Sequence, residues 1–187
     1  MSTSKKKILE IIEIPSSTEV EIDNSIIKIT GPKGTLEREL SHPFIKISKE
    51  NNAIRLEQID KKTTKKSKKM LMTFKSHIKN MIVGVSEGFT YHLKIVSGHF
   101  PISVSLESNN KVVIKNFLGE KVPRVAHINP NTKATIKGDE ITIESVDIES
   151  AGQSAANIES ATRITNRDRR IFQDGVYIVQ KPSRRLK

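Results

Sequence analysis

The chain has 187 residues, no cysteine, and 32 lysine and arginine residues against 21 aspartate and glutamate residues, for a net charge of +11. The lack of cysteine excludes disulfides, thiol nucleophiles and cysteine zinc sites, and no apolar stretch approaches the roughly 20 residues of a membrane span. The charge favours nucleic acid or an anionic membrane surface as partner, and we expect a cytosolic or nuclear protein.

The first half of the chain reads as a series of short strands followed by one helix. Apolar and β-branched runs predict strands at 8–14, 20–22, 26–30, 35–40, 44–48 and 53–59. The turn Gly31-Pro32-Lys33-Gly34 joins two of these strands. A helix is predicted over about 62–83, and its apolar stripe, which should face the sheet, consists of Leu71, Phe74, Ile78 and Ile82.

After Gly84 and Gly88, the second half repeats this order. Strands are predicted at 91–97, 104–106, 112–115, 121–128, 135–136 and 140–145, and a closing strand at 176–180. A second helix is expected over about 151–172, begun by a capping box of Ser150 and Gln153. Its predicted buried stripe consists of Ala151, Ala155, Ile158, Thr162 and Thr165.

The two halves are similar to each other. Residues 20–40 correspond to 104–125, residues 47–59 correspond to 136–147, and the helical stretch that ends at 81–85 corresponds to the one that ends at 171–176. A repeat of this kind fixes the architecture more firmly than any local pattern. We therefore predict an α+β fold of two tandem similar domains, each a small, mainly antiparallel sheet packed against one helix. The predicted divisions are 1–88, 89–180 and a basic tail at 181–187.

Lysines crowd the start of the first predicted helix. They are Lys61, Lys62, Lys65, Lys66, Lys68 and Lys69. Positive charge at a helix N-terminus opposes the helix dipole, at a cost of up to about 1 kcal/mol per exposed charge. A solvated helix face is the alternative, but the cluster makes better physical sense when phosphates lie close by. We select Lys65, Lys68 and Lys69 as candidate RNA contacts.

The second cluster is rich in arginine. It follows a stretch, 139–162, that has six carboxylates and no lysine or arginine. The planar guanidinium binds phosphate or a guanine edge through two parallel hydrogen bonds. If the helix continues through this segment, Arg163, Arg167 and Arg170 lie on one stripe beside its buried face. The candidate contacts at this end are Arg163, Asn166, Arg167, Arg169 and Arg170, with Lys181, Arg184 and Arg185 from the tail.

The sequence offers no catalytic centre. Its five histidines are scattered without metal-ligand spacing, and the turn at Gly31–Gly34 joins two strands and does not open a helix, as a phosphate-binding loop would. Lys33 in that turn remains a candidate phosphate contact. Aromatic residues are 4% of the chain, which disfavours stacking on single-stranded bases and favours folded RNA. We expect no enzyme activity, no cofactor, no metal and no small-molecule substrate.

These residues resemble a known family. The similarity lies in the duplicated halves, in 29–36, in the segment Gly98-His99-Phe100-Pro101-Ile102, and in 153–158 with residues of 163–177. The chain is similar to the universal large-subunit ribosomal protein six family, numbered nine in the eukaryotic scheme, of the archaeal and eukaryotic cytosolic type. It departs from the usual pattern at Ser160, where glutamine is common, and in its heavier lysine block.

The resemblance implies a structural constituent of the large ribosomal subunit that binds rRNA near the stalk base and the sarcin–ricin loop. It implies that the second domain makes the main rRNA contacts, that other ribosomal proteins are neighbours, and that translational GTPases dock nearby. It also implies a cytoplasmic location on the ribosome, with a nucleolar stage if the protein is eukaryotic. The alternative is an RNA-binding or ribosome-assembly factor that does not stay on the subunit.

Overall fold

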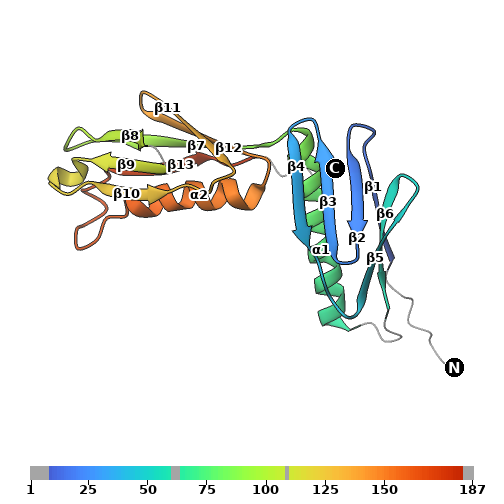
Figure 1. Cartoon of the computed structure of the whole chain (residues 1–187). Helices are drawn as coiled ribbons and strands as arrows, with labels where there is room; N and C mark the ends of the chain where they lie inside the picture. Colours follow the sequence, from blue (N-terminus) through green and yellow to red (C-terminus); the bar gives the residue numbers. More distant parts are fainter. Residues whose placement is uncertain (1–8, 60–63, 108–109, 183–187) are drawn as a thin grey trace. The chain divides into compact units, whose positions relative to one another are not determined.

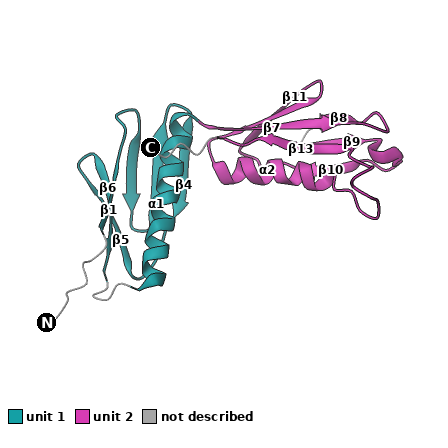
Figure 2. Ribbon diagram, turned by 180° about the vertical axis from the view of Figure 1, so that it is seen from behind, with its two compact units in different colours: residues 1–87 teal, residues 88–187 magenta. Residues whose placement is uncertain are grey.

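The computed structural model describes residues 9–59, 64–107 and 110–182, and the chain forms two compact units, 1–87 and 88–187 (Figures 1 and 2). Each unit is an α+β structure with two small antiparallel sheets and one α-helix. The predicted fold class is confirmed.

Unit 1 has two three-stranded sheets. One has the strand order β2-β3-β4 and the other β1-β6-β5, and all of their neighbouring strands are antiparallel. The elements are β1 (Leu9–Glu13), β2 (Glu19–Asp23), β3 (Ile26–Gly31), β4 (Gly34–Glu39), β5 (Ile45–Glu50), β6 (Ala53–Gln58) and α1 (Lys65–Ser86).

The core of unit 1 lies between α1 and the inner faces of both sheets. Ile27 and Ile29 of β3, and Ile54 and Leu56 of β6, are completely buried. The predicted stripe of α1 is buried as well, and Leu71 has no exposed surface. Each such side chain contributes roughly 1.5–3 kcal/mol through burial.

The first helix begins three residues later than predicted. Thr64 has extended backbone angles, and its hydroxyl accepts a hydrogen bond from the backbone N–H of Ser67. The hydroxyl of Ser67 in turn accepts one from the backbone N–H of Thr64, at 3.1 Å, which completes a capping box. Lys65 is therefore the first helical residue, whereas Lys61 and Lys62 lie outside the described residues.

The Gly31–Gly34 turn packs on the C-terminal end of α1. The backbone N–H of Lys33 donates to the carbonyl of Val85 at 2.9 Å. A Cβ atom on Gly31 would lie 2.8 Å from that same carbonyl oxygen and 2.8 Å from Cγ2 of Val85. Position 31 therefore needs glycine because strand β3 and the helix end approach too closely for a side chain.

Unit 2 repeats this plan with one extra strand. Its sheets have the orders β10-β9-β8 and β11-β12-β7-β13, again antiparallel throughout. The elements are β7 (Phe89–Val96), β8 (Ser103–Glu107), β9 (Lys111–Lys115), the short 3-10 helix η1 (Phe117–Gly119), β10 (Arg124–His127), β11 (Thr132–Lys137), β12 (Glu140–Ser145), α2 (Ile148–Ala161) and β13 (Gly175–Gln180).

The second helix is shorter than predicted. It begins after Asp147, whose carboxylate accepts hydrogen bonds from the backbone N–H groups of Glu149 and Ser150. Ser150 is thus inside the helix, and the predicted Ser150–Gln153 capping box is wrong. The helix ends at Ala161, so Phe172 is eleven residues beyond it. The predicted arginine stripe on this helix is also wrong, because the arginines follow the helix in a loop.

The hydroxyl of Thr162 explains why α2 stops there. It accepts a hydrogen bond from the backbone N–H of Val176, at 2.9 Å, and donates to the carbonyl of Glu159. Ile164 then turns into the core, whereas Thr165, which was predicted to be buried, is exposed. A bond to a strand fourteen residues away thus overrides the helical pattern.

The contact between Gly31 and Val85 gives a first prediction. Gly31→Ala should destabilise unit 1 by about 1–3 kcal/mol, because the added methyl group forces β3 away from the end of α1. Hydrogen exchange of the full chain should show faster exchange in β3 and α1 and unchanged exchange in unit 2. Lys33→Ala, in the same turn, is the control and should leave exchange unchanged. Equal exchange for Gly31→Ala and the control would contradict the packing argument.

Candidate nucleic-acid interface

The candidate interface of unit 2 is the loop 163–174, between α2 and β13. It has five exposed polar or cationic residues that the sequence selected, Arg163, Asn166, Arg167, Arg169 and Arg170. Asn166 has a φ of 58°, in the left-handed region that asparagine tolerates better than most residues. The structure thus places these five side chains on one exposed loop.

Arg124 of β10 holds the start of this loop. Its guanidinium donates to the carbonyls of Ala161 at 2.9 Å and Arg163 at 3.1 Å, which lie at and just past the end of α2. Two more of its hydrogen bonds go to the carboxylate of Glu120, and its charge lies 4.2 Å from the ring centre of Phe117. The hydrogen bonds and charge of Arg124 lower the pKa of Glu120. Arg124 is therefore a structural residue and is not free to bind phosphate.

Asp174 holds the other end of the loop. Its side chain is completely buried, and it accepts hydrogen bonds from the backbone N–H groups of Gly98 and His99. Nδ1 of His99 lies 3.4 Å from the same carboxylate. Burial alone would raise the pKa of Asp174, but the hydrogen bonds and the charge of His99 outweigh burial and lower it. The loop is thus tied to the segment after β7.

Between these ends, three side chains stack. The rings of His99 and Phe172 are stacked at 4.8 Å between centroids, and the guanidinium of Arg167 lies 4.9 Å from the centre of the Phe172 ring. A cation above an aromatic ring gains roughly 0.5–1 kcal/mol at an exposed site. The stack fixes the position of Arg167 on the surface. Since both partners of Phe172 belong to the chain, its ring is engaged within the protein.

Residues of α2, the loop and β13 line a cavity of about 330 Å³. It is lined by Glu159, Ser160, Thr162, Arg163, Ile164, Arg169 and Tyr177. The hydroxyl of Tyr177 donates to the carbonyl of Gln173 at 3.1 Å, and a carboxylate oxygen of Glu159 accepts from the backbone of Ile178. The wall of the cavity is therefore fixed by hydrogen bonds, and two arginines line it.

Arg170 makes a local ion pair. Its guanidinium lies 3.1 Å from the carboxylate of Asp168, and the backbone N–H of Arg170 donates to the same group. Both contacts lower the pKa of Asp168. The Arg170 side chain is 90% exposed, so this pair contributes little to stability and leaves the arginine accessible.

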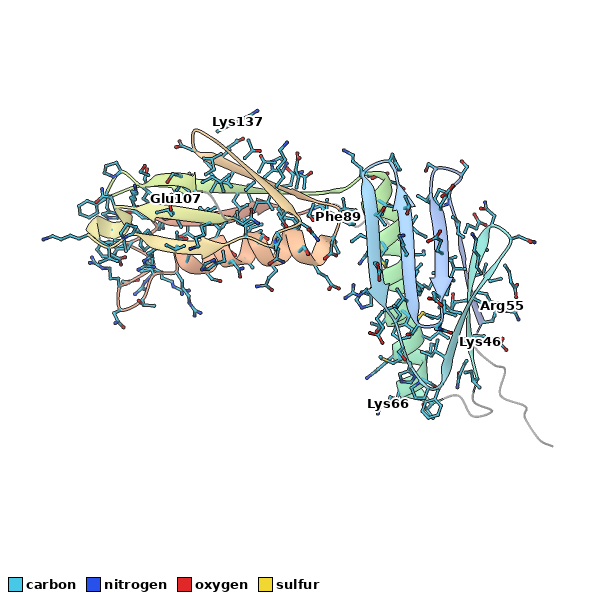
Figure 3. The ribbon with its side chains drawn as sticks, in the orientation of Figure 1. Lys46, Arg55, Lys66, Phe89, Glu107 and Lys137 are labelled. Carbon is cyan, nitrogen blue, oxygen red and sulfur yellow. The ribbon has the colours of Figure 1, made fainter. Side chains whose placement is uncertain are left out.

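The other candidate cations lie elsewhere. Lys65, Lys68 and Lys69 are exposed in the first turns of α1, where no acidic residue offsets them (Lys66 is labelled at this end in Figure 3). Lys181 is exposed just after β13, and Arg184 and Arg185 lie outside the described residues. Lys33 is exposed in its turn. The lysines of α1 belong to unit 1 and the arginine loop to unit 2, so each cluster is a separate candidate surface.

Sequence reasoning missed Arg124 and Asp174. Arg124 bonds to nearby Glu120 but also to carbonyls 37 and 39 residues away, and Asp174 bonds to N–H groups 75 and 76 residues away, so the local sequence does not show that either residue fixes the loop. One signal was present: Asp174 belongs to the segment 163–177 whose residues carry the family resemblance. Within the described ranges there is no cluster of three or more metal-ligating acidic or histidine side chains. No described helix is long and apolar enough to cross a membrane.

The chain is similar to known proteins over most of its length. The family model for ribosomal protein L6 matches residues 14–88 and, again, residues 100–175. A large ribosomal subunit protein uL6 from Desulfurococcus amylolyticus is 46% identical over 93% of this chain and 95% of its own length. Proteins of the same name from Staphylothermus marinus and Methanosarcina mazei are 48% and 46% identical over 91% and 94% of this chain, and 93% and 98% of their own lengths.

The buried Asp174 gives a second prediction. Asp174→Asn should destabilise unit 2 by roughly 1–3 kcal/mol, because the amide group cannot accept all the hydrogen bonds of the carboxylate. The two tyrosines, Tyr91 and Tyr177, are both in unit 2 and tryptophan is absent, so tyrosine fluorescence reports urea unfolding of this unit. Asp139→Asn, in an exposed turn, is the matched control and should change stability by less than about 0.5 kcal/mol.

The same variant should also change how the stability of unit 2 depends on pH. The pKa of Asp174 is lower in the folded chain than its usual value near 3.9, so its stabilisation is present above about pH 4 and is lost as the pH falls through the lowered value. Asp174→Asn should therefore lose less stability on acidification than the unsubstituted chain. An identical acid dependence for both proteins would show that the carboxylate does not act in this way.

Proposed function

This chain belongs to the ribosomal protein L6 family, and we propose that it is a structural constituent of the large ribosomal subunit that binds rRNA. Family membership agrees with the expectation that the chain is no enzyme. Its archaeal relatives carry the name of a large-subunit protein, which supports a location on the cytoplasmic ribosome. A nucleolar stage applies only to a eukaryotic protein.

The observation that carries the proposal is the anchored arginine loop of unit 2. Four arginines between Arg163 and Arg170 are exposed on a loop fixed by Arg124 at one end and by Asp174 at the other. An exposed guanidinium binds phosphate oxygens through two parallel hydrogen bonds, and a fixed loop loses little entropy on binding. We propose residues 89–180 as the main rRNA-binding domain, with Arg163, Asn166, Arg167, Arg169 and Arg170 as contacts and the tail as a further contact.

The aromatic residues support recognition of a folded RNA surface. Phe172 is engaged within the protein, since its ring stacks on His99 and lies close to the guanidinium of Arg167. Exposed guanidinium groups suit contacts to phosphate, ribose and groove edges. The lysines Lys65, Lys68 and Lys69 at the start of α1 form the proposed contact of unit 1, where bound phosphates would also relieve the unfavourable interaction with the helix dipole.

We further propose, from the family resemblance, that the rRNA partner lies near the stalk base and the sarcin–ricin loop. Translational GTPases would then dock nearby, and other ribosomal proteins would be neighbours. A high-salt wash separates this role from that of a visiting assembly factor. A constituent stays on the large subunit after the wash, whereas recovery of the chain in the wash fraction would favour the factor.

Charge reversal tests the arginine loop. The double variant Arg167→Glu with Arg170→Glu should lower affinity for a large-subunit rRNA fragment by about two orders of magnitude, because two phosphate contacts become repulsive. Its incorporation into subunits should fall in parallel. The control carries the same change in charge at Lys133→Glu and Lys137→Glu of β11, which are exposed in the same unit (Lys137 is labelled in Figure 3). Equal losses for both double variants, or unfolding of the free arginine variant, would contradict the assigned contacts.

Salt dependence tests whether single arginines reach phosphates. The logarithm of the affinity should fall linearly with the logarithm of salt concentration, and each phosphate contact contributes roughly 0.7–0.9 to the slope. Arg169→Ala should make the slope shallower by about that amount, whereas Lys137→Ala should leave it unchanged. An unchanged slope for Arg169→Ala would remove Arg169 from the interface.

A further inference from the structure

The internal duplication aligns β1 of unit 1 with β7 of unit 2, residue by residue. Just beyond β1, the backbone N–H of Ile14 donates to the carbonyl of Asn52, in the turn before β6, at 2.9 Å. In unit 2 the backbone N–H of Ile95 donates to the carbonyl of Asp139, in the turn before β12, at 2.7 Å. Ile14 is therefore the counterpart of Ile95, and the strands can be compared from that point.

The two strands have different neighbours. In unit 2, β7 lies between β12 and β13, whereas in unit 1 β1 is paired with β6 alone among the described strands. Counting back from the aligned pair, Glu13 corresponds to Lys94 and Ile11 to His92. Lys94 is paired with Tyr177 and His92 with Gln180 of β13. Within the described residues, the edge of β1 is thus open where β7 has an antiparallel neighbour.

The ladder shows which backbone groups this edge presents. In an antiparallel pair, residues alternate between those bonded to the neighbouring strand and those whose N–H and C=O point away from it. The hydrogen bond of Ile14 to Asn52 continues the register of the β1–β6 pairs. By the alternation, the backbone N–H and C=O groups of Ile12 and Glu10 therefore point toward β6. Leu9, Ile11 and Glu13 consequently direct their N–H and C=O groups to the open edge.

The side chains at this edge also suit a further strand. Leu9 and Ile11 are 43% and 58% exposed on the face away from α1, although both are large apolar residues. On the face toward α1, Glu10 forms an ion pair with Lys75. By helical period, Lys79 lies on the same side of α1 as Lys75. The edge is therefore apolar on its outer face and basic along its helix.

We propose that the edge of β1 binds an extended segment of a neighbouring protein as an antiparallel strand. Its residues would alternate, with apolar side chains opposite Ile11 and Leu9 and acidic side chains toward the lysines of α1. Main-chain hydrogen bonds to Leu9, Ile11 and Glu13 hold such a strand, as β13 is held in unit 2. A second copy of the chain fits less well, because its β1 would bring a second row of lysines against the first. The surface lies in unit 1 and takes a protein, so it is separate from the arginine loop.

The test places a photoactivatable amino acid at Leu9 and isolates large ribosomal subunits that contain the chain. Identification of the cross-linked peptide should show one segment of one other ribosomal protein, with alternating apolar and acidic residues. Cross-links to rRNA, to a second copy of this chain, or to nothing would overturn the inference. The experiment rests on the proposed function only because it looks for the partner on the large subunit. Absence of the chain from subunits contradicts that function. A chain that is present in subunits but forms no cross-link contradicts only the proposal that the edge of β1 binds a strand.

A second variant shows that the backbone edge is responsible. Ile11→Pro removes an N–H that points to the open edge but not one bonded to β6, so it should abolish the cross-link from position 9. Ile11→Val keeps the N–H and should retain the cross-link. Hydrogen exchange of α1 and β6 in the free chain should be the same in both variants, which shows that unit 1 remains folded. Retention of the cross-link by a folded Ile11→Pro chain would exclude strand pairing.

Discussion

The hydrogen bonds between Thr162 and Val176 are the constraint on which the arrangement of unit 2 depends. The Thr162 hydroxyl accepts from the backbone N–H of Val176 and so joins the end of α2 to the start of β13. Both groups are buried, and breaking such a bond leaves an unsatisfied donor at a cost of about 1–3 kcal/mol. Because the two elements are joined here, residues 163–174 must form a loop; Ile164 and Asp174 stay buried, whereas the arginines of the loop are exposed.

The architecture was predictable because the duplication indicates two similar domains and the alternation of apolar residues indicates which face of each strand is buried. The turn at Gly31–Gly34 and the buried stripe of α1 were both predicted and are present. The length of α2 was not predictable in the same way. Ala151, Ala155, Ile158 and Thr162 are in helical phase and all are buried, so the pattern continues to the residue that ends the helix. A local period carries no information about a hydrogen-bond partner fourteen residues later.

The candidate site was predictable in composition but not in geometry. A run of arginines identified the exposed loop, since charged side chains cluster where a polyanion is bound. The residues that fix the loop, Arg124 and Asp174, act through buried or half-buried hydrogen bonds to distant backbone groups. In the sequence, Arg124 is one of 32 lysine and arginine residues, and Asp174 is an acidic residue next to a basic segment. Only the fold distinguishes an arginine that fixes the loop by hydrogen bonds from an arginine that is exposed to solvent.

The two copies of the fold differ in the chain that continues from each helix. After α2 the chain forms the arginine loop and returns as β13, which covers the free edge of β7 and adds Val176 to the core. After α1 the chain continues directly into β7, so no described strand of unit 1 returns to β1. In unit 2 the edge of β7 is thus paired with β13, whereas in unit 1 no described strand pairs with the corresponding edge of β1. Exposed edges are normally protected because they recruit other chains. An edge left with two exposed apolar side chains is consistent with a protein whose working environment is a dense assembly.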